Sequence, residues 1–242
     1  MWFFKKKKEM PKLDFSVLGT DLHSHFIPGI DDGAKDLETS ILLIKKMKSL
    51  GYKKLITTPH VMSDVYQNTT ESILNGLQIV KKELKNQDID IEISAAAEYY
   101  VDFEFEQKIS LNNFLTFGDN YILIELSFVE PPRNLFDTIF KLQIEKYKVV
   151  LAHPERYQYY NIDDYRELRN RGVLLQINLL SLIGYYSSDI KKKTEKMIRE
   201  GLVNLVGTDC HNIHHSELYE QCQILPVWHD LINSKKLINH NL

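Results

Sequence analysis

The chain has 242 residues, of which 43% are hydrophobic and 26% are charged, with 10 glycines and 7 prolines. This composition is typical of a folded globular protein and excludes collagen-like, disordered and disulfide-stapled classes. The formal net charge of −3 argues against nucleic-acid binding through a broadly basic surface, and 2 cysteines are too few for a disulfide framework, which favours a cytoplasmic protein.

Residues 1–17 are predicted to form a basic leader, because a short apolar stretch is followed by lysines at positions 5–8. That order does not fit a signal peptide, and the segment is too short to cross a membrane. No later run reaches about 18 apolar residues, so no transmembrane segment is predicted. We expect a solvated tail, with weak contact to an anionic membrane or an acidic partner as the alternative.

Short segments rich in β-branched and apolar residues recur along the chain after the leader. They are predicted as strands at 18–22, 54–58, 91–96, 121–126, 148–152, 173–178 and 203–207. Several of these segments are nearly continuous apolar runs without alternation, as expected for strands that are buried on both faces of a parallel sheet.

Helical patterns fill the gaps between these strands. The clearest lies at 36–50, where Asp36 can cap the amino end and Gly51 stands at the carboxyl end. Segments 166–171 and 191–200 repeat the pattern, each followed by a glycine and then a strand. The alternation predicts an α/β fold, either a closed barrel or an open doubly wound sheet. No linker is visible, so 18–242 is expected to be a single domain with an extension from about residue 213.

Reactive side chains cluster at the carboxyl ends of the predicted strands, where α/β proteins build their sites. They are His23, His25, His60, Glu98, Glu125, His153, Asp209 and His211. His23 and His25 are two positions apart on extended backbone, so both imidazoles project to one face, and Asp209 and His211 repeat this spacing. Imidazole and carboxylate ligands without thiolates favour a catalytic manganese, iron or zinc site over a structural zinc site.

Five motifs give the chain a specific resemblance: DLHSH at 21–25, PGIDDGA at 28–34, TPH at 58–60, AHPERY at 152–157 and GTDCH at 207–211. They resemble the polymerase-and-histidinol-phosphatase (PHP) superfamily, and within it the bacterial manganese-dependent tyrosine-protein phosphatases of capsule and exopolysaccharide loci. The resemblance implies a distorted TIM-like barrel of seven βα units, the PHP barrel. It also implies three divalent metal ions, with manganese expected and iron or zinc as alternatives.

The resemblance assigns a role to each ligand. One metal would be held by His23, His25, Glu98 and Asp209, a second by Glu98, Glu125 and His153, and a third by Asp32, His60 and His211. Asp31 is the alternative to Asp32 as a ligand of the third metal. The assignment of Glu125 depends on a short Ile-Glu-Leu motif. Arg156 resembles the phosphate-binding arginine of the family. Arg133, which follows two prolines, is a second candidate for substrate binding or a solvated loop residue.

The implied activity is hydrolysis of phosphotyrosine by attack of a metal-bound hydroxide on phosphorus. His153, Arg156 and Asp209 are the expected catalytic residues, and the proton for the leaving tyrosinate comes from Asp209 or from a metal-bound water. The expected partner is a phosphotyrosine protein, a bacterial tyrosine autokinase. A small-molecule phosphatase of the histidinol-phosphate type and a catalytically silent, metal-bound regulatory scaffold are the alternatives.

One rival mechanism is excluded by spacing. A cysteine-dependent tyrosine phosphatase needs an arginine six residues after its catalytic cysteine. Ser216 stands six residues after Cys210, and Trp228 stands six residues after Cys222. The pattern of a P-loop is also missing from the sequence.

Aromatic residues beyond the strand ends form either a wall for a phenyl ring or ordinary core. They are Tyr99, Tyr100, Phe103, Phe105, Phe128, Tyr157, Tyr159 and Tyr160. The residues after 212 contain four further histidines, which we expect outside the metal sites, in a closing helix or an oligomer contact. A homo-oligomer is compatible with the sequence, but no residue pattern indicates one.

Overall fold

Each of the seven predicted strand segments forms a parallel strand in the structure, a computed structural model that describes residues 10–111 and 113–242. The strands are β1 (Thr20–Asp21), β2 (Lys54–Thr57), β3 (His60–Val61), β4 (Glu92–Ala95), β5 (Glu98–Tyr100), β6 (Tyr121–Glu125), β7 (Lys148–Ala152), β8 (Leu174–Asn178) and β9 (Leu205–Gly207). β3 and β5 have no counterpart among the predicted strands, because segments of 2 and 3 residues carry no periodic pattern.

The strands pair in a three-stranded sheet of order β1-β2-β4 and a six-stranded sheet of order β3-β5-β6-β7-β8-β9. β3 follows β2, and β5 follows β4, after only two residues, so each pair is one strand with an interruption. Pro59 lies at the first interruption, where it has no N–H to donate, and its carbonyl oxygen accepts a hydrogen bond from the Glu98 N–H at 3.1 Å. His60 and Glu98 therefore begin the two short strands side by side.

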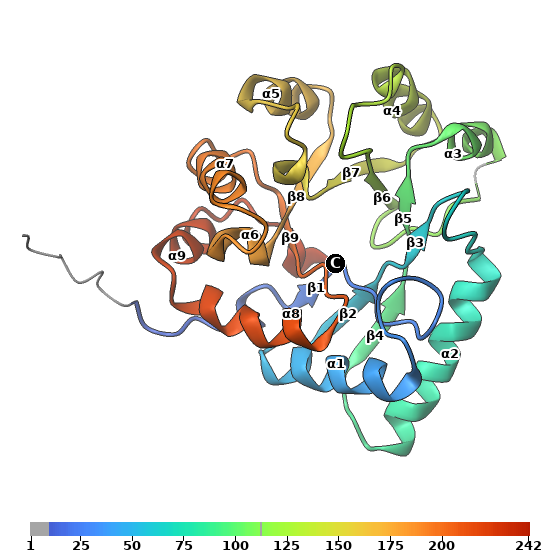
Figure 1. Cartoon of the computed structure of the whole chain (residues 1–242), viewed down its shortest axis with the longest axis vertical. Helices are drawn as coiled ribbons and strands as arrows, with labels where there is room; N and C mark the ends of the chain where they lie inside the picture. The colour runs from blue at the N-terminus through green and yellow to red at the C-terminus, as the bar shows by residue number, and fades with distance from the viewer. Residues whose placement is uncertain (1–9, 112) are drawn as a thin grey trace, which may run out of the picture.

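Backbone hydrogen bonds also join the first strand to the last. The Asp209 N–H donates to the His23 carbonyl oxygen at 2.8 Å, and the His25 N–H donates to the Cys210 carbonyl oxygen at 3.0 Å. β1 is also paired with β2, so these bonds connect the last strand back to the first. The strands therefore form a hydrogen-bonded ring. Figure 1 shows the strands at the centre and the helices around the outside, which is the arrangement expected of a distorted TIM-like barrel.

Two apolar clusters lie on the two faces of the strands. The inner one consists of Leu22, Ile56, Ala96, Phe117, Leu123, Val150, Ala152 and Leu205, most of which lie in or beside strands of the ring. The outer one is larger and fills the layer between strands and helices, with Ile44 and Leu77 among its helical members. Because both faces of the strands are buried, the strands appear in the sequence as continuous apolar runs.

The helices alternate with the strands as predicted. They are α1 (Leu37–Ser49), α2 (Thr70–Asn86), α3 (Phe103–Lys108), α4 (Leu135–Ile144), α5 (Ile162–Asn170), α6 (Leu179–Ile183), α7 (Ser188–Arg199), α8 (Ile213–Leu218) and α9 (Pro226–Asn233), with 3-10 turns η1 (Phe15–Val17), η2 (Ile109–Leu111), η3 (Pro154–Arg156), η4 (Tyr219–Ile224) and η5 (Asn239–Asn241). The helix predicted at 36–50 is confirmed, and Asp36 accepts a hydrogen bond from the Thr39 N–H at its start. α5 begins before the predicted residue 166, because Asn161 and Asp164 form a capping box.

The end of the predicted extension at 213–242 packs across the amino ends of the first and last strands. The side-chain amide of Asn239 donates to the Thr20 and Val206 carbonyl oxygens at 3.1 and 2.8 Å, and its oxygen accepts from the Val206 N–H at 3.0 Å. Ile238 and Leu242 lie against the inner cluster. The end of the extension thus covers the amino end of the ring, whereas α8, at the start of the extension, lies beside the open carboxyl end.

The lysines of the predicted leader, at 5–8, lie outside the described residues. Phe15 is fully buried and packs against the rings of Tyr52 and Trp228, and the Trp228 indole N–H donates to the Leu13 carbonyl oxygen at 2.9 Å. The leader segment from Leu13 onward is therefore part of the folded core. Among the helices that the structure describes, none is long and apolar enough to span a membrane.

Candidate metal centre

The predicted ligands converge at the carboxyl end of the ring. His23 and His25 follow β1, Asp32 lies in the next loop, His60 begins β3, Glu98 begins β5, Glu125 ends β6, His153 follows β7, and Asp209 and His211 follow β9. They fall into four overlapping sets in which the ligand atoms lie within 4.8 Å of one another. All nine predicted ligand residues belong to at least one set, so the structure brings the whole predicted group together.

Glu98 occupies the middle of this group. Its carboxylate is fully buried, with Oε2 lying 3.1 Å from His23 Nε2 and 3.2 Å from His60 Nδ1. Its other oxygen, Oε1, lies 3.0 Å from His153 Nε2, and Glu125 Oε1 approaches the same nitrogen at 3.5 Å. The two oxygens of Glu98 therefore face different histidines, an arrangement that would let one carboxylate serve two ions.

Asp209 lies on the side of the ligand group that is next to the first and last strands. Its Oδ1 lies 3.4 Å from His23 Nε2 and 3.5 Å from His25 Nε2. Asp209 and His153 both adopt left-handed backbone conformations, with φ angles of 54° and 34°. Residues with side chains rarely adopt this region, and such backbone strain is concentrated at functional sites.

The neighbouring aspartates Asp31 and Asp32 have different positions. Asp32 is half-exposed, and its Oδ1 lies 3.5 Å from His60 Nε2 and 3.4 Å from His211 Nε2. Asp31 is buried, and its Oδ2 lies 2.7 Å from His25 Nδ1. Burial opposes ionisation of Asp31, but the adjacent His25 ring and hydrogen bonds lower its pKa to about 2. Asp32 therefore belongs to a ligand set, whereas Asp31 fixes the ring of His25.

Replacing Asp31 with asparagine is expected to weaken Mn²⁺ binding about 10-fold to 100-fold, because a ligand histidine loses its charged hydrogen-bond partner. Titration of metal-free protein with Mn²⁺ measures the effect. Asp32→Asn, at the neighbouring aspartate, is the control variant. We expect it to lose one ion per chain, with little change in the affinity of the other metal sites. An Asp31→Asn variant that binds Mn²⁺ like the unmodified protein would contradict the positioning role.

Two polar residues of β8 support the ligands, and sequence reasoning missed them. His23 Nδ1 lies 2.7 Å from Gln176 Oε1, and the Gln176 amide donates to Asn178 Oδ1 at 2.9 Å. The Asn178 amide in turn donates to Asp209 Oδ2 at 2.6 Å. Gln176 and Asn178 are two positions apart in an otherwise apolar strand, and this alternation was the available signal.

A second unpredicted contact joins the first and last strands beneath the site. Asp21 accepts hydrogen bonds from the Thr208 hydroxyl at 2.7 Å and from the Thr208 N–H at 2.9 Å. Burial raises the pKa of Asp21 to about 7, although these hydrogen bonds oppose the shift. The Thr208 hydroxyl oxygen also lies 3.1 Å from the His23 carbonyl oxygen, so this pair fixes the backbone that carries the first predicted ligand.

Arg156 lies at the edge of the ligand group, between two aromatic rings. The centre of its guanidinium lies 4.5 Å from the Phe128 ring and 4.6 Å from the Tyr186 ring. Its Nη1 lies 3.2 Å from Asp209 Oδ2. The Phe128 ring also stacks on His153, with centroids 5.7 Å apart. The rings and the carboxylate together fix the direction of the guanidinium.

The neighbouring residue Glu155 fixes the position of the turn that carries Arg156. The Glu155 carboxylate is fully buried and accepts hydrogen bonds from the Asn178 N–H at 2.8 Å and the Ser181 hydroxyl at 2.6 Å. Burial raises the pKa of Glu155 to about 7. Glu155 is not in any of the ligand sets, so its contacts serve the position of the turn.

The remaining candidates for substrate contact lie at different distances from the ligand group. Arg133 lines a cavity of about 200 Å³ beside α5, and none of the predicted ligands lines that cavity. Among the aromatic candidates, Tyr99, Phe105 and Tyr157 are buried in the outer core. Tyr157 also packs against His153, with ring centroids 5.8 Å apart. Phe128 is 44% exposed and lies against Arg156, which makes it an exposed candidate beside the site.

The four histidines after residue 212 are absent from the ligand sets found among the described residues. His215 lies near the site, with its ring centroid 5.9 Å from that of His211 and its Nε2 3.2 Å from the Tyr185 hydroxyl. Cys210 and Cys222 are free and buried, and burial raises the pKa of both thiols. The cysteines thus lack the character of reactive thiolates.

The chemistry of the donor group fits divalent cations. His60 Nδ1 is buried and has no hydrogen-bond partner among the described residues, although it lies 3.2 Å from Glu98 Oε2. Burial and the nearby carboxylates of Glu98 and Asp209 raise the pKa of Glu125 well above its usual range. Cations among these groups would neutralise the carboxylates and give the imidazole a partner. Histidine and carboxylate donors suit manganese, iron or zinc.

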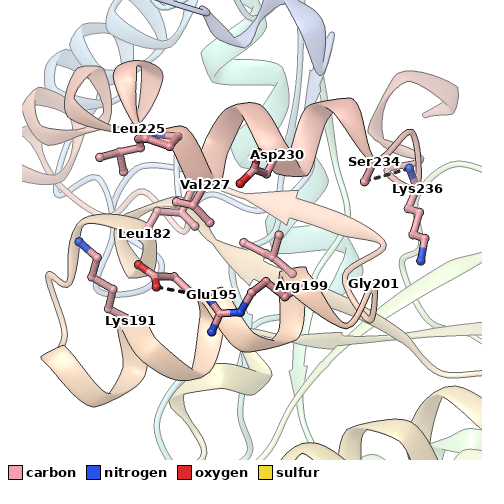
Figure 2. Close-up of a pocket in the computed structure, with 12 residues that line it drawn as sticks. Leu182, Lys191, Glu195, Arg199, Gly201, Leu225, Val227, Asp230, Ser234 and Lys236 are labelled. Atoms are coloured by element: carbon pink, nitrogen blue, oxygen red, sulfur yellow. Dashed lines mark hydrogen bonds and ion pairs between the residues drawn. The ribbon is translucent and has the colours of Figure 1, made fainter. Parts of the chain in front are cut away.

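A cavity of about 590 Å³ lies away from this group, between α7 and α9 (Figure 2). Its wall includes Arg199, which lies 3.7 Å from Glu195 on the same helix, and Asp230 of α9. None of the predicted ligands lines this cavity. The reactive chemistry of the described residues is therefore concentrated at the open end of the ring.

A ring of parallel strands with helices outside, and with histidines and carboxylates at the carboxyl ends of the strands, defines a TIM-like metal-dependent hydrolase. The family model described as "Capsular polysaccharide synthesis, CpsB/CapC" matches residues 19–223. The chain therefore belongs to the CpsB/CapC family, and the predicted resemblance is confirmed.

Similar proteins carry informative names. The chain is 30% identical over 204 residues to "Tyrosine-protein phosphatase YwqE" of Bacillus subtilis, covering 83% of this chain and 80% of that protein. It is 27% identical over 209 residues to "Tyrosine-protein phosphatase CpsB" of Streptococcus pneumoniae, covering 83% and 86%. The solved structures described as YwqE from Bacillus subtilis and CpsB from Streptococcus pneumoniae, "unique metal-dependent tyrosine phosphatases", give a TM-score of 0.80 at 28% identity, with 91% and 89% coverage.

Proposed function

We propose that this protein is a metal-dependent protein-tyrosine phosphatase that hydrolyses phosphotyrosine on a partner protein. The observation that carries the proposal is the position of Arg156 beside the nine predicted ligands. A cationic guanidinium and bound divalent ions together match the charge and shape of a phosphate dianion. The names of the relatives YwqE and CpsB support the same substrate class.

We assign the ligands to three manganese ions as the resemblance implies, with Asp32, His60 and His211 on the third. The grouping of these three residues with His25 supports this assignment. The central position of Glu98 supports its role as a bridge between the other two ions. Ions bound there would neutralise phosphate charge and lower the pKa of a coordinated water.

The residues of the chain itself have separate roles in this proposal. Arg156 donates hydrogen bonds to phosphoryl oxygens and stabilises the negative charge of the transition state. Asp209 Oδ2 accepts from Asn178 and faces Arg156, so Asp209 positions the guanidinium in addition to binding metal. Phe128 is 44% exposed beside Arg156, so part of its ring is available to contact the phenyl group of the substrate.

We further propose a bacterial tyrosine kinase as the partner and a cytoplasmic role in capsule or exopolysaccharide synthesis. The description of the family supports the pathway. The two free cysteines agree with a reducing compartment. We propose that residues 18–242, with the residues from Leu13 packed against them, act as a single domain in which the end of the extension covers the amino end of the ring.

Activity and metal content test the function together. Purified protein is stripped with a chelator and reloaded with Mn²⁺, Fe²⁺ or Zn²⁺, and phosphate release is measured from p-nitrophenyl phosphate, a phosphotyrosine peptide and histidinol phosphate. We expect about three ions per chain and a higher kcat/KM on the peptide than on histidinol phosphate. No phosphate release between pH 6 and 9 with any metal would overturn the proposal. Stoichiometry of about one ion would remove Asp32, His60 and His211 from the ligand list.

A further inference from the structure

A cavity of about 460 Å³ opens next to the metal centre, and none of the roles assigned above uses it. One wall is the segment between β3 and α2, represented by Met62 and Tyr66, and the other is formed by α3 and η2, represented by Phe105 and Leu111. The lining combines apolar and aromatic side chains with polar and charged ones, as in sites that bind organic ligands in a fixed orientation.

The near end of the cavity is built directly on the metal centre. The ring of Tyr66, which lines the cavity, stacks on His60 with centroids 5.5 Å apart and an angle of 11° between the planes. The side-chain amide of Asn68, also in the lining, donates to the His60 and Ile30 carbonyl oxygens at 2.9 Å each. A ligand in the cavity would therefore lie next to a phosphate bound at the metals.

The two walls are fixed to each other by Asp102. Its Oδ2 accepts from the Ser63 N–H at 3.1 Å and the Ser63 hydroxyl at 2.8 Å, and its Oδ1 caps α3 by accepting from the Phe105 N–H at 2.8 Å. The shape of the cavity thus exists before any ligand binds, which lowers the entropy lost on binding.

The inner lining is a packed group of aromatic rings. Tyr99, Phe105 and Phe114 lie with centroids 4.8 to 5.6 Å apart, and the Tyr99 hydroxyl is held by the Leu115 N–H at 2.6 Å. Leu111 stands at the rim with 70% of its surface exposed. Lys108, a lysine of the lining, forms an ion pair with Glu104 at 3.2 Å. The aromatic part of the lining, with Leu111 at its rim, is therefore suited to an apolar group.

We propose that this cavity binds the polypeptide next to the phosphotyrosine of the substrate and takes an apolar side chain of that segment. The inference rests on the phosphatase function proposed above. A small aryl phosphate has no atoms beyond its ring, whereas an extended peptide spans about 3.3 Å per residue. A side chain two or three positions from the phosphotyrosine can therefore reach past Tyr66 into the cavity. The cavity would thus give the enzyme a preference for protein substrates with apolar residues near the tyrosine.

Two peptides and two variants test the proposal. The peptides carry phosphotyrosine with either leucine or serine at the second and third positions on each side, and p-nitrophenyl phosphate serves as the small substrate. Leu111→Glu places a charge at the rim of the cavity, and Leu42→Glu, at a 49% exposed leucine of α1, is the matched control. Because neither leucine is buried, we expect both variants to fold.

We expect the unmodified protein to favour the leucine peptide by about tenfold in kcat/KM. Leu111→Glu should remove that preference while leaving p-nitrophenyl phosphate hydrolysis unchanged, and Leu42→Glu should preserve both. Equal rates on the two peptides, or a preference that survives Leu111→Glu, would overturn the cavity proposal alone. Binding of the corresponding phosphonate peptides by calorimetry makes the same comparison without turnover. A lack of activity on all phosphate esters would overturn the phosphatase function instead.

Discussion

Replacing Glu98 with glutamine is expected to lower kcat by about 1,000-fold, equivalent to roughly 4 kcal/mol of transition-state stabilisation, together with loss of bound metal. The two oxygens of Glu98 face three histidine nitrogens at 3.0 to 3.2 Å. Glutamine keeps the size of the side chain but offers one neutral oxygen and an N–H₂ group that cannot bind a cation. Metal analysis of the purified variant and its rate on p-nitrophenyl phosphate measure the two effects.

A buried glutamate outside the ligand sets is the matched control. Glu155 is also fully buried, but it accepts hydrogen bonds from Asn178 and Ser181. Glu155→Gln should therefore keep the metal content of the unmodified protein. A Glu98→Gln variant that retains both full metal content and full activity would show that the buried carboxylate is structural.

Replacing Arg156 with methionine is expected to lower kcat/KM by about 100-fold to 1,000-fold while the metal content stays unchanged. The guanidinium is the cation placed at the edge of the ligand group, and its position between Phe128 and Tyr186 prepares it for a phosphate. Arg156→Lys should recover little of the loss, because an ammonium cannot donate a planar pair of hydrogen bonds.

Arg133, the second arginine predicted to bind substrate, is the control for the Arg156 prediction. Arg133 lines a separate small cavity, so Arg133→Met should leave the rate on p-nitrophenyl phosphate near that of the unmodified protein. Metal analysis of both variants separates a loss of phosphate binding from a loss of ions. A large fall in activity for Arg133→Met, with Arg156→Met nearly unaffected, would reverse the assignment of the two arginines.

Much of the fold follows from local sequence. The strand positions are recognisable because strands covered on both faces need continuous apolar residues, as in Lys148–Ala152. Helix starts are recognisable where an aspartate caps the first turn, as Asp36 does. The predicted ligands other than Asp32 are recognisable because they stand at or just after the ends of those strands, where a parallel array brings its carboxyl ends together. Asp32 lies in a loop and was predicted only from the resemblance of the PGIDDGA motif.

Other features depend on contacts between distant parts of the chain. Gln176 and Asn178 support the ligands only because β8 is a neighbour of β9 in the ring. The different roles of Asp31 and Asp32 depend on which carboxylate the loop turns toward His25. Phe128 becomes part of the site through its packing on Arg156, and no local pattern distinguishes it from other aromatic residues beyond the strand ends.

The hydrogen bonds between Asp21 and Thr208 have a consequence for the biosynthesis of the protein, because these residues are 187 positions apart in the sequence. His23 and His25 are translated well before Asp209 and His211. A nascent chain therefore cannot hold the complete set of proposed ligands until Asp209 and His211 have been made. Closing so long a loop costs conformational entropy, which bound ions can help to offset only after both ends have met. Binding of a complete set of ions is accordingly expected to follow the meeting of the first and last strands.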